Sequence, residues 1–495
     1  MTVMIEAQDL PTPLLEFGTG ETSDPKAGLT RYGPFSLRFG AAHKTQVQVG
    51  LVGPSAMIKQ AQAWFTRCEA PIVSNHANVA MYPDYPGFQA AFHSTIVIAP
   101  MWNVVLADED VQRNLALEPV ERFQAVLDLY GRGIERLANA DVRPDVIVCC
   151  LSEDIITSCR TVTNARLTTK QRIWALRQQQ ALRAGQLTLF EEEIVEEAPE
   201  DLLFRDFRRA LKARAMLYRI PIQIGTMNLF LDSDTNQDPA TRAWNVSVAL
   251  FYKAGGIPWR LKTDGPETCF VGISFHHLRT KSNDLVYSSL AQAFSTEGDG
   301  FALRGSALPW TSDWERHTHL PEEQAASLAR QVLNEYHERT GRDPARIVLH
   351  KTSRYDDAER RGFREALRNI PIVELVTLAQ RPQLRLVQLG SYPPRRGLLC
   401  TVNDAATYVF TTGFVPEWGT YPGPHIPVPI QLITDEGADR FRLAAEVFGL
   451  SRMNWNTARD TSGYPITLRF ARDVGTIMAE VSPQLSPNPS YRYYM

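Results

Sequence analysis

The sequence predicts an α/β protein in which a doubly wound domain with a parallel sheet precedes a second α/β domain. Buried-strand and amphipathic-helix patterns alternate through the first half of the chain, which is the order expected of a parallel sheet covered by helices. The second half starts with three strand patterns in succession and then alternates helices with strands. The 495 residues, 44% hydrophobic and 22% charged, suffice for two or three packed cores.

The first 44 residues are rich in Gly, Pro and Thr. This composition predicts an extended arm with short strands and no core of its own. Organised structure is expected to begin at Thr45, where a strand over Thr45–Gly53 leads into a helix over Ser55–Cys68 with Met57, Ile58, Ala61 and Phe65 on one face. The next expected elements are a strand at Ser94–Ala99, a helix at Pro119–Ala138 and a strand at Asp145–Leu151.

The α/β pattern is interrupted over residues 161–200. Thr168–Ala184 has the composition of a polar helix, and Glu191–Glu200 contains six glutamates in ten residues. Runs of like charge usually stay exposed to solvent. A solvated acidic excursion and a surface that docks a partner are both open interpretations.

A strongly basic segment follows the acidic one. Asp201–Ile220 has the pattern of an amphipathic helix and carries six cations against two acids. The expected elements after it are a strand at Ile220–Gly225 and a helix over Asn245–Tyr252 that reaches Lys253 and ends at Gly255 and Gly256.

The second domain is expected to begin at Glu267. Its three leading strands and the alternating elements after them are typical of a ribonuclease-H-like layer. The expected strands are Thr268–Phe275, Asp284–Phe294, Phe301–Leu303, Arg346–His350, Ile370–Leu378, Arg385–Leu389 and Gly397–Val402. The expected helices are Pro321–Thr340, Asp356–Arg368 and Asp439–Phe448.

Composition excludes several classes of protein. No apolar run approaches the roughly 18–20 residues that span a bilayer, and the acidic N-terminus does not resemble a signal peptide. Six irregularly spaced cysteines favour neither a disulfide framework nor a CxxC metal site, so a cytoplasmic location is expected. The formal net charge of −3 gives no global basic excess, but nucleic-acid binding depends on local clusters of cations.

One cluster of polar residues could bind a phosphate. Arg208 and Lys212 lie four residues apart and share a helix face. Gln223 follows on the next strand, and Lys253 and Asn245 lie two turns apart on one face of the later helix. Two cations, an amide and a third cation make a phosphate pocket. The alternative is an ordinary solvated helix face.

The order of these segments resembles the MID domain of Argonaute proteins, which grips the 5′ end of a guide strand. The resemblance rests on the basic helix, IPIQIG with Gln223, and Lys253 followed by AGGIPW. It continues through Val271–Phe275, Ile347–Tyr355 and Asn454–Ala471, which look like landmarks of the PIWI domain. The implied fold is a Rossmann-like MID domain over 45–265, with the excursion at 161–200, followed by a ribonuclease-H-like PIWI domain over 266–495. The chain length leaves no room for N and PAZ domains, so the chain looks like a short prokaryotic Argonaute.

The resemblance assigns roles to individual residues. It implies that Lys212, Gln223 and Lys253 contact the guide 5′ phosphate, that Asn245 binds a neighbouring phosphate, and that Arg208 contacts the first base or the phosphate. Arg205 or Arg209 could replace Arg208 if the helix register differs by a residue. The C-terminal carboxylate of Met495 would bind Mg²⁺ together with the 5′ phosphate.

The PIWI half is predicted to be catalytically inactive. Two-metal cleavage requires converging carboxylates, whereas the positions that resemble the catalytic ones hold Ser274, Thr352, Asn454 and Asn456, with the cation Lys351 beside them. Other potential ligands are scattered and each has an ordinary structural interpretation. They are His276, His277, Glu297, Asp299 and Asp404.

The resemblance implies a guide-loaded sensor of invading nucleic acid in prokaryotic defence. The implied partners are a 5′-phosphorylated guide RNA, a complementary single-stranded DNA target and an APAZ-domain effector protein that is sirtuin-like, TIR or a nuclease, with a higher oligomer on activation as one outcome. Basic PIWI residues expected along the duplex are Arg279, Lys281, Lys351, Arg354, Arg395 and Arg396. Two alternatives remain: a guide-dependent nuclease with non-standard metal ligands, and a scaffold protein with a vestigial guide pocket.

Overall fold

The computed structural model describes most of the chain. The described residues are 4–162, 205–232, 237–279, 285–294, 300–309, 319–381, 384–386, 393–403, 406–422, 426–459, 463–481, 488 and 490–495. The helix predicted at 168–184 and the glutamate run at 191–200 lie outside them, as do Lys281, Glu297, Asp299 and Asp404. The chain divides into two compact units: a smaller one of 49–64 and 98–231, and a larger one of 1–48, 65–97 and 232–495. Each unit combines segments that are far apart in the sequence, whereas the predicted domains, 45–265 and 266–495, are continuous. The predicted domain boundaries therefore stay a prediction.

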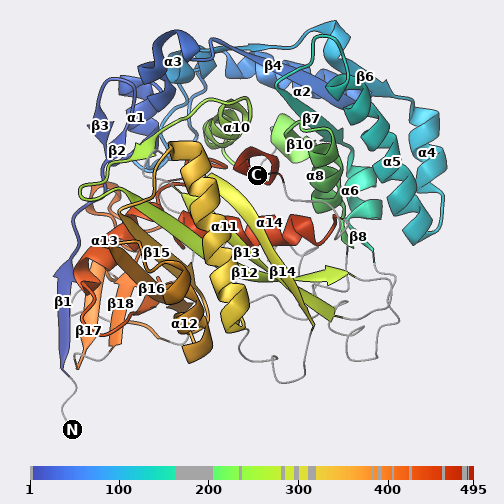
Figure 1. Cartoon of the computed structure of the whole chain (residues 1–495). Coiled ribbons are helices and arrows are strands. Elements are labelled where there is room, and N and C mark those ends of the chain that lie inside the picture. The colour runs from blue at the N-terminus through green and yellow to red at the C-terminus, as the bar shows by residue number, and fades with distance from the viewer. Residues whose placement is uncertain are drawn as a thin grey trace. The chain divides into compact units, whose positions relative to one another are not determined.

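The smaller unit has a parallel sheet at its core. Strand β7 (Val146–Leu151) lies between β10 (Ile222–Thr226) and β4 (Gln46–Pro54), and β6 (Asn103–Leu106) pairs with the far end of β4. All six residues of β7 are buried, as expected for a strand covered on both faces. The doubly wound arrangement predicted from the alternating pattern is therefore confirmed (Figure 1).

Helices flank this sheet. Pro119 occupies the first turn of α5 (Pro119–Ala138), where its missing N–H is not needed. Helix α5 packs against α8 (Phe207–Leu217) through edge-to-face contacts of Phe207 with Phe123 and Tyr130. The other elements are α4 (Asp108–Leu115), α6 (Glu153–Cys159), α9 (Met227–Phe230), the 3₁₀ turn η2 (Pro100–Trp102), and the pair β8 (Thr161–Val162) and β9 (Arg205–Asp206). Helix α2 (Ser55–Cys68) has the predicted bounds.

The larger unit contains a nine-stranded sheet in the order β1-β17-β18-β19-β16-β15-β12-β13-β14. Its centre is parallel, with β15 between β12 and β16, and the flanking pairs are antiparallel. The bounds are β1 (Ile5–Asp9), β12 (Thr268–Arg279), β13 (Leu285–Phe294), β14 (Gly300–Pro309), β15 (Arg346–Lys351), β16 (Ile372–Gln380), β17 (Leu398–Val402), β18 (Ala406–Phe410) and β19 (Ile430–Ile433). The predicted ribonuclease-H-like layer is confirmed.

Side-chain alternation sends successive residues of β12 and β15 to opposite faces of this sheet. On one face, Val271, Ile273 and Leu349 join a buried cluster with α11 (Glu322–Thr340) and α12 (Asp357–Ala366). On the other face, α14 (Ile466–Met478) lies so close to β12 that a Cβ on Gly272 would come 2.1 Å from the Thr467 carbonyl oxygen. Figure 1 shows α11 and α14 on opposite sides of β12. A glycine is therefore required at position 272.

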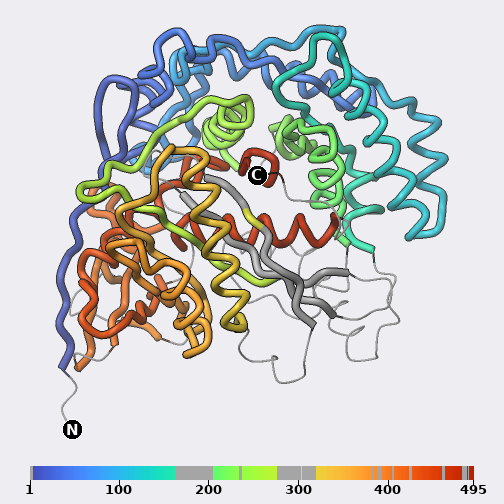
Figure 2. Tube along the Cα trace, in the orientation of Figure 1, coloured from blue at the N-terminus to red at the C-terminus, as the bar shows by residue number. Residues whose placement is uncertain are grey.

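The N-terminal 44 residues are part of the larger unit. Strand β1 pairs with β17 almost 400 residues later, and Figure 2 shows the blue N-terminal strand beside that orange one. The predicted short strands exist, as β1, β2 (Leu15–Glu16) and β3 (Glu21–Thr22), with β2 also paired to β11 (Arg260–Leu261). The segment also contains a helix that was not predicted, α1 (Pro25–Tyr32), and Leu15, Phe17 and Leu29 of the segment are fully buried.

Other elements of the larger unit are α3 (Phe88–Phe92), β5 (Thr95–Val97), which pairs with the start of β4, α10 (Pro239–Lys253), α13 (Arg440–Leu450), and the 3₁₀ turns η1 (Phe35–Ala42), η5 (Pro416–Trp418) and η6 (Tyr491–Tyr493). Strand β12 continues to Arg279, so the histidines at 276 and 277 lie within it. Arg385 is not in a strand, contrary to the prediction, and residues 387–389 are outside the described ones.

Among the described helices, none is both long and apolar enough to cross a membrane.

Candidate functional site

Helix α8 presents the basic face predicted from the sequence. It starts at Phe207, because the Asp206 carboxylate caps it by accepting a hydrogen bond of 3.0 Å from the Arg209 amide. Its apolar side, including Phe207 and Leu211, is buried, whereas Arg208 is exposed and Lys212 is half-buried. The eleven residues hold four cations and no acid, so the helix is a strongly positive surface of the smaller unit.

The helix begins later than the sequence predicts, and this separates Arg208 from one of its two alternatives, Arg205. Arg205 lies in β9, ahead of the helix, with its guanidinium 4.8 Å from the Phe123 ring centroid and 3.4 Å from the Gln124 amide oxygen. Arg214 forms an ion pair with Asp128. Arg209 is half-buried on the helix, so it stays an alternative to Arg208.

Gln223 occupies the second position of β10, opposite Val148 of β7. Its side-chain amide donates a hydrogen bond of 3.2 Å to the Ile224 carbonyl oxygen. Helix α8 packs against β10, so Arg208, Lys212 and Gln223 belong to two contacting elements of one unit.

Asn245 and Lys253 belong to α10 in the larger unit. The Asp238 carboxylate caps this helix through the Thr241 amide and hydroxyl, at 2.9 and 3.0 Å. Every residue of α10 except Pro239 and Asn245 is buried. The side-chain oxygen of Asn245 accepts a hydrogen bond of 3.0 Å from the Ala458 amide. Asn245 therefore connects α10 to the segment that follows α13.

Lys253 ends α10 with a side chain that is 2% exposed. The last residues of the chain pack against this end of the helix, as the dark red segment beside α10 shows in Figure 1. Tyr491 lies 6.5 Å, centroid to centroid, from the Tyr252 ring, and burial raises the pKa of Tyr491 far above its usual value. Met495 is 2% exposed. Lys253 and the chain end, predicted to act together, are thus both buried in one unit.

The predicted phosphate-binding residues fall into two groups. The smaller unit holds Arg208, Lys212 and Gln223, and the larger unit holds Asn245, Lys253 and Met495. Their roles stay predictions. Arg492 is not among the residues predicted from the sequence, and its guanidinium lies beside the turn that follows Lys253. The signal in the sequence that could have identified Arg492 is a basic residue within the aromatic run at the chain end.

The four positions predicted to lack catalytic carboxylates are placed as follows. The Ser274 hydroxyl, on β12, donates a hydrogen bond of 2.8 Å to the Ala471 carbonyl oxygen of α14. Thr352 is exposed directly after β15. Asn454 is buried, and its side-chain oxygen accepts a hydrogen bond of 3.0 Å from the amide of the exposed Asn456.

Lys351 is not a surface cation. Its side chain is 1% exposed, and its Nζ lies 2.5 Å from each carboxylate oxygen of the fully buried Glu359. Phe275 and Tyr355 cover the ammonium, with ring centroids 5.7 and 4.9 Å away. Burial lowers the pKa of Lys351, and the negative Glu359 opposes this shift. The prediction that Lys351 lies along a nucleic-acid duplex is therefore wrong.

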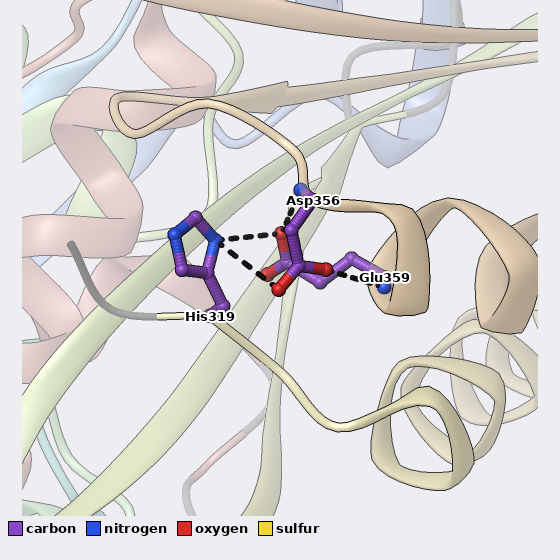
Figure 3. Close-up of side chains that lie close together, drawn as sticks. All are labelled: His319, Asp356 and Glu359. Atoms are coloured by element: carbon purple, nitrogen blue, oxygen red, sulfur yellow. Dashed lines mark hydrogen bonds and ion pairs between the residues drawn. The ribbon is translucent and has the colours of Figure 1, made fainter. Parts of the chain in front are cut away.

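His319, Asp356 and Glu359 form a cluster with the residue types of a metal site (Figure 3). Ordinary contacts account for it. Glu359 accepts hydrogen bonds from Lys351, from the Leu320 amide at 2.8 Å and from the Asp356 amide at 3.2 Å. Asp356 caps α12 through the Glu359 amide, which completes a capping box. The ammonium of Lys351 is already the cation paired with Glu359, so this carboxylate is not available to a metal.

Comparison with solved structures relates this fold to known proteins. Clostridium butyricum Argonaute, bound to a guide DNA and a 19-mer target DNA, matches with 14% identity and a TM-score of 0.61, covering 98% of this chain and 54% of that one. Drosophila Piwi matches with 11% identity and a TM-score of 0.57, covering 98% and 56%. A. aeolicus Argonaute matches with 12% identity and a TM-score of 0.55, covering 98% and 55%.

The chain spans about half the length of the solved structures that it matches. No protein-family model matches the sequence, and no curated protein matches it. At these identities the likeness concerns the fold: the chain has the MID–PIWI architecture of Argonaute and Piwi proteins, as the resemblance of its motifs predicts.

Proposed function

We propose that this chain binds the 5′-phosphorylated end of a guide strand and, through the guide, a complementary target strand. The observation that carries the proposal is the nearly buried Lys253 at the end of α10, within a fold matched over 98% of its length by an Argonaute bound to guide and target DNA. An ammonium at this position can bind a phosphate through charge-assisted hydrogen bonds. A phosphate monoester, with about −1.5 to −2 charges, is a suitable ligand.

The basic face of α8 supports the same proposal. Arg208 and Lys212 share one face of a helix that contains no acid, and a cationic surface of this kind attracts the phosphates of a strand without reading its bases. Sequence recognition would then come from base pairing between guide and target. The proposed guide is RNA and the proposed target is single-stranded DNA.

Mg²⁺ belongs to the proposal only at the guide 5′ phosphate. The Met495 carboxylate and the phosphate would offer it the oxygen ligands that this ion prefers. The cluster of His319, Asp356 and Glu359 is not part of this proposal, because its Glu359 is already paired with Lys351.

We infer that the chain itself does not cleave nucleic acid. Ser274, Thr352, Asn454 and Asn456 offer no carboxylate for a two-metal mechanism, and the Ser274 hydroxyl is engaged with Ala471. The output would then come from a separate APAZ-domain effector that is sirtuin-like, TIR or a nuclease, and that is switched on when the target pairs with the guide in prokaryotic defence.

Nucleic acid that copurifies with the full chain tests the proposal. We expect short 5′-phosphorylated strands with wild-type protein and a large reduction with the Lys212→Ala/Lys253→Ala double variant. Equal and low amounts in both would instead favour a scaffold with a vestigial pocket. Guide-dependent cleavage of a matched target in Mg²⁺ or Mn²⁺, abolished by Ser274→Ala or Thr352→Ala, would favour a nuclease with non-standard ligands.

A further inference from the structure

Arg492 lies beside the turn that ends α10. Gly255, two residues after Lys253, has a φ of 105°, a conformation that favours glycine. A Cβ at this glycine would come within 3.5 Å of Nη1 of Arg492. The guanidinium thus lies beside the turn that follows Lys253.

The residues around Arg492 hold its backbone in place. Tyr491 and Tyr494 are each 1% exposed. The Tyr491 ring stacks on Phe470, and its hydroxyl donates a hydrogen bond of 3.3 Å to the Asp473 carboxylate. The Tyr494 hydroxyl donates one of 2.9 Å to the Asn488 carbonyl oxygen. Two buried anchors therefore flank a half-buried arginine.

The charge of Arg492 has no counter-ion in the part of the chain that the structure describes. Its Nε donates a hydrogen bond of 3.1 Å to the neutral Ser490 hydroxyl. The nearby carboxylate, Asp473, accepts from the Tyr491 hydroxyl. This differs from Arg214, Arg346 and Arg360, which all form ion pairs with carboxylates.

We propose that Arg492 is the second cation of the anion site at the end of α10 and makes that site select a terminal phosphate over a hydroxyl. This inference rests on the proposed function and adds a residue that determines its specificity. The C-terminal end of a helix carries partial negative charge and disfavours an anion, so one ammonium there is a weak phosphate site. A guanidinium adds a planar pair of donors that matches two phosphate oxygens.

The experiment compares the affinity of the full chain for one short RNA carrying either a 5′ phosphate or a 5′ hydroxyl. We expect Arg492→Gln to raise the Kd of the phosphorylated strand about tenfold, the loss typical of one charge-assisted hydrogen bond. The Kd of the hydroxyl strand should stay within twofold. The slope of log Kd against log salt should fall by about 0.7 for the phosphorylated strand only.

Two further variants separate a phosphate contact from a structural role. Arg492→Lys keeps the charge and should recover part of the preference for phosphate. Arg368→Gln makes the same chemical change at an exposed arginine of the same unit and should leave both affinities unchanged. Loss of folding would lower both affinities together and leave their ratio unchanged.

Three results are distinguishable. A wild-type preference for the phosphorylated strand that Arg492→Gln removes supports the inference. A preference that survives Arg492→Gln but is lost in Lys253→Met overturns it and leaves the proposed function standing. Equal affinity of the wild-type chain for both strands contradicts the recognition of a 5′ phosphate, and the inference with it.

Discussion

Two lysines of the larger unit are almost completely buried, and their surroundings differ. Lys351 ends β15 and forms an ion pair with Glu359, eight residues away on α12. Lys253 ends α10, and the guanidinium of Arg492 from the C-terminal segment lies beside the turn that follows this helix. Lys351 is paired with a carboxylate from inside the fold, whereas the proposed function assigns Lys253 to a phosphate of a bound strand. We therefore expect Lys351 to contribute to the stability of the fold and Lys253 to contribute to the proposed strand binding.

Replacing Lys351 tests the structural side of this comparison and should have the largest effect. Lys351→Met leaves the Glu359 carboxylate buried without its cation, so we expect the free energy of unfolding to fall by about 3–5 kcal/mol. Urea denaturation followed by tryptophan fluorescence measures it. Lys351→Met/Glu359→Leu removes both charges and should recover most of the loss. A loss below about 1 kcal/mol in the single variant would show that the pair is not a buried ion pair.

Replacing Lys253 tests the binding side. Lys253→Met should raise the Kd of a 5′-phosphorylated strand about tenfold to a hundredfold, because a charge-assisted hydrogen bond contributes about 1.5–3 kcal/mol. The matched control is the same strand with a 5′ hydroxyl, whose affinity should change little. If Lys351→Met, measured where it is still folded, weakened phosphate binding as much as Lys253→Met, the distinction between the two lysines would be lost.

His350 precedes Lys351 on β15 and faces α14, where its Nδ1 lies 2.9 Å from the Thr467 hydroxyl. Burial, with the positive Arg346 nearby, lowers the pKa of His350 to about 3. The unfolded chain therefore binds the extra proton between the usual histidine pKa of about 6.5 and the folded value of about 3, so stability is lost as the pH falls through this window.

We expect His350→Gln to flatten the acid limb of the stability curve by up to about 1.4 kcal/mol per pH unit. Urea denaturation at a series of pH values measures the slope. An unchanged slope in the variant would indicate that His350 titrates normally in the folded protein.

The smallest effect is expected at Arg208, which is exposed on α8. Exposed charges are screened by solvent and salt, so Arg208→Gln should weaken strand binding by less than tenfold. Arg214→Gln removes a cation that Asp128 already neutralises and should have less effect still. A larger loss for Arg214 than for Arg208 would indicate that another face of α8 meets the strand.

Local patterns predicted the elements well where the signal lay in neighbouring residues. Helices α2 and α5 have the predicted bounds, because a turn residue or proline starts each and an apolar stripe continues it. The start of α8 was predicted too early, since Arg205 and Asp206 pair with Thr161 and Val162 across more than 40 residues. The pairing of β1 with β17 is equally distant and has no local signal.

The residue types of the candidate site could be predicted from the sequence. The burial of these residues and the side chains around them could not. The sequence identifies Lys253 and Lys351 as lysines at element ends but does not show that Glu359 reaches back to one of them. Their burial depends on α12 and on the C-terminal segment, which are brought in by tertiary packing. Arg492 became a candidate only when the structure placed it beside Gly255.

The central claim is that the end of α10 binds a strand through its terminal phosphate. The most direct measurement is the ratio of the two dissociation constants for one strand with a 5′ hydroxyl and with a 5′ phosphate, on the full wild-type chain at fixed salt. We expect a ratio of about ten or more, from at least one charge-assisted contact. In Lys253→Met this ratio should approach one. A wild-type ratio of one would contradict the central claim.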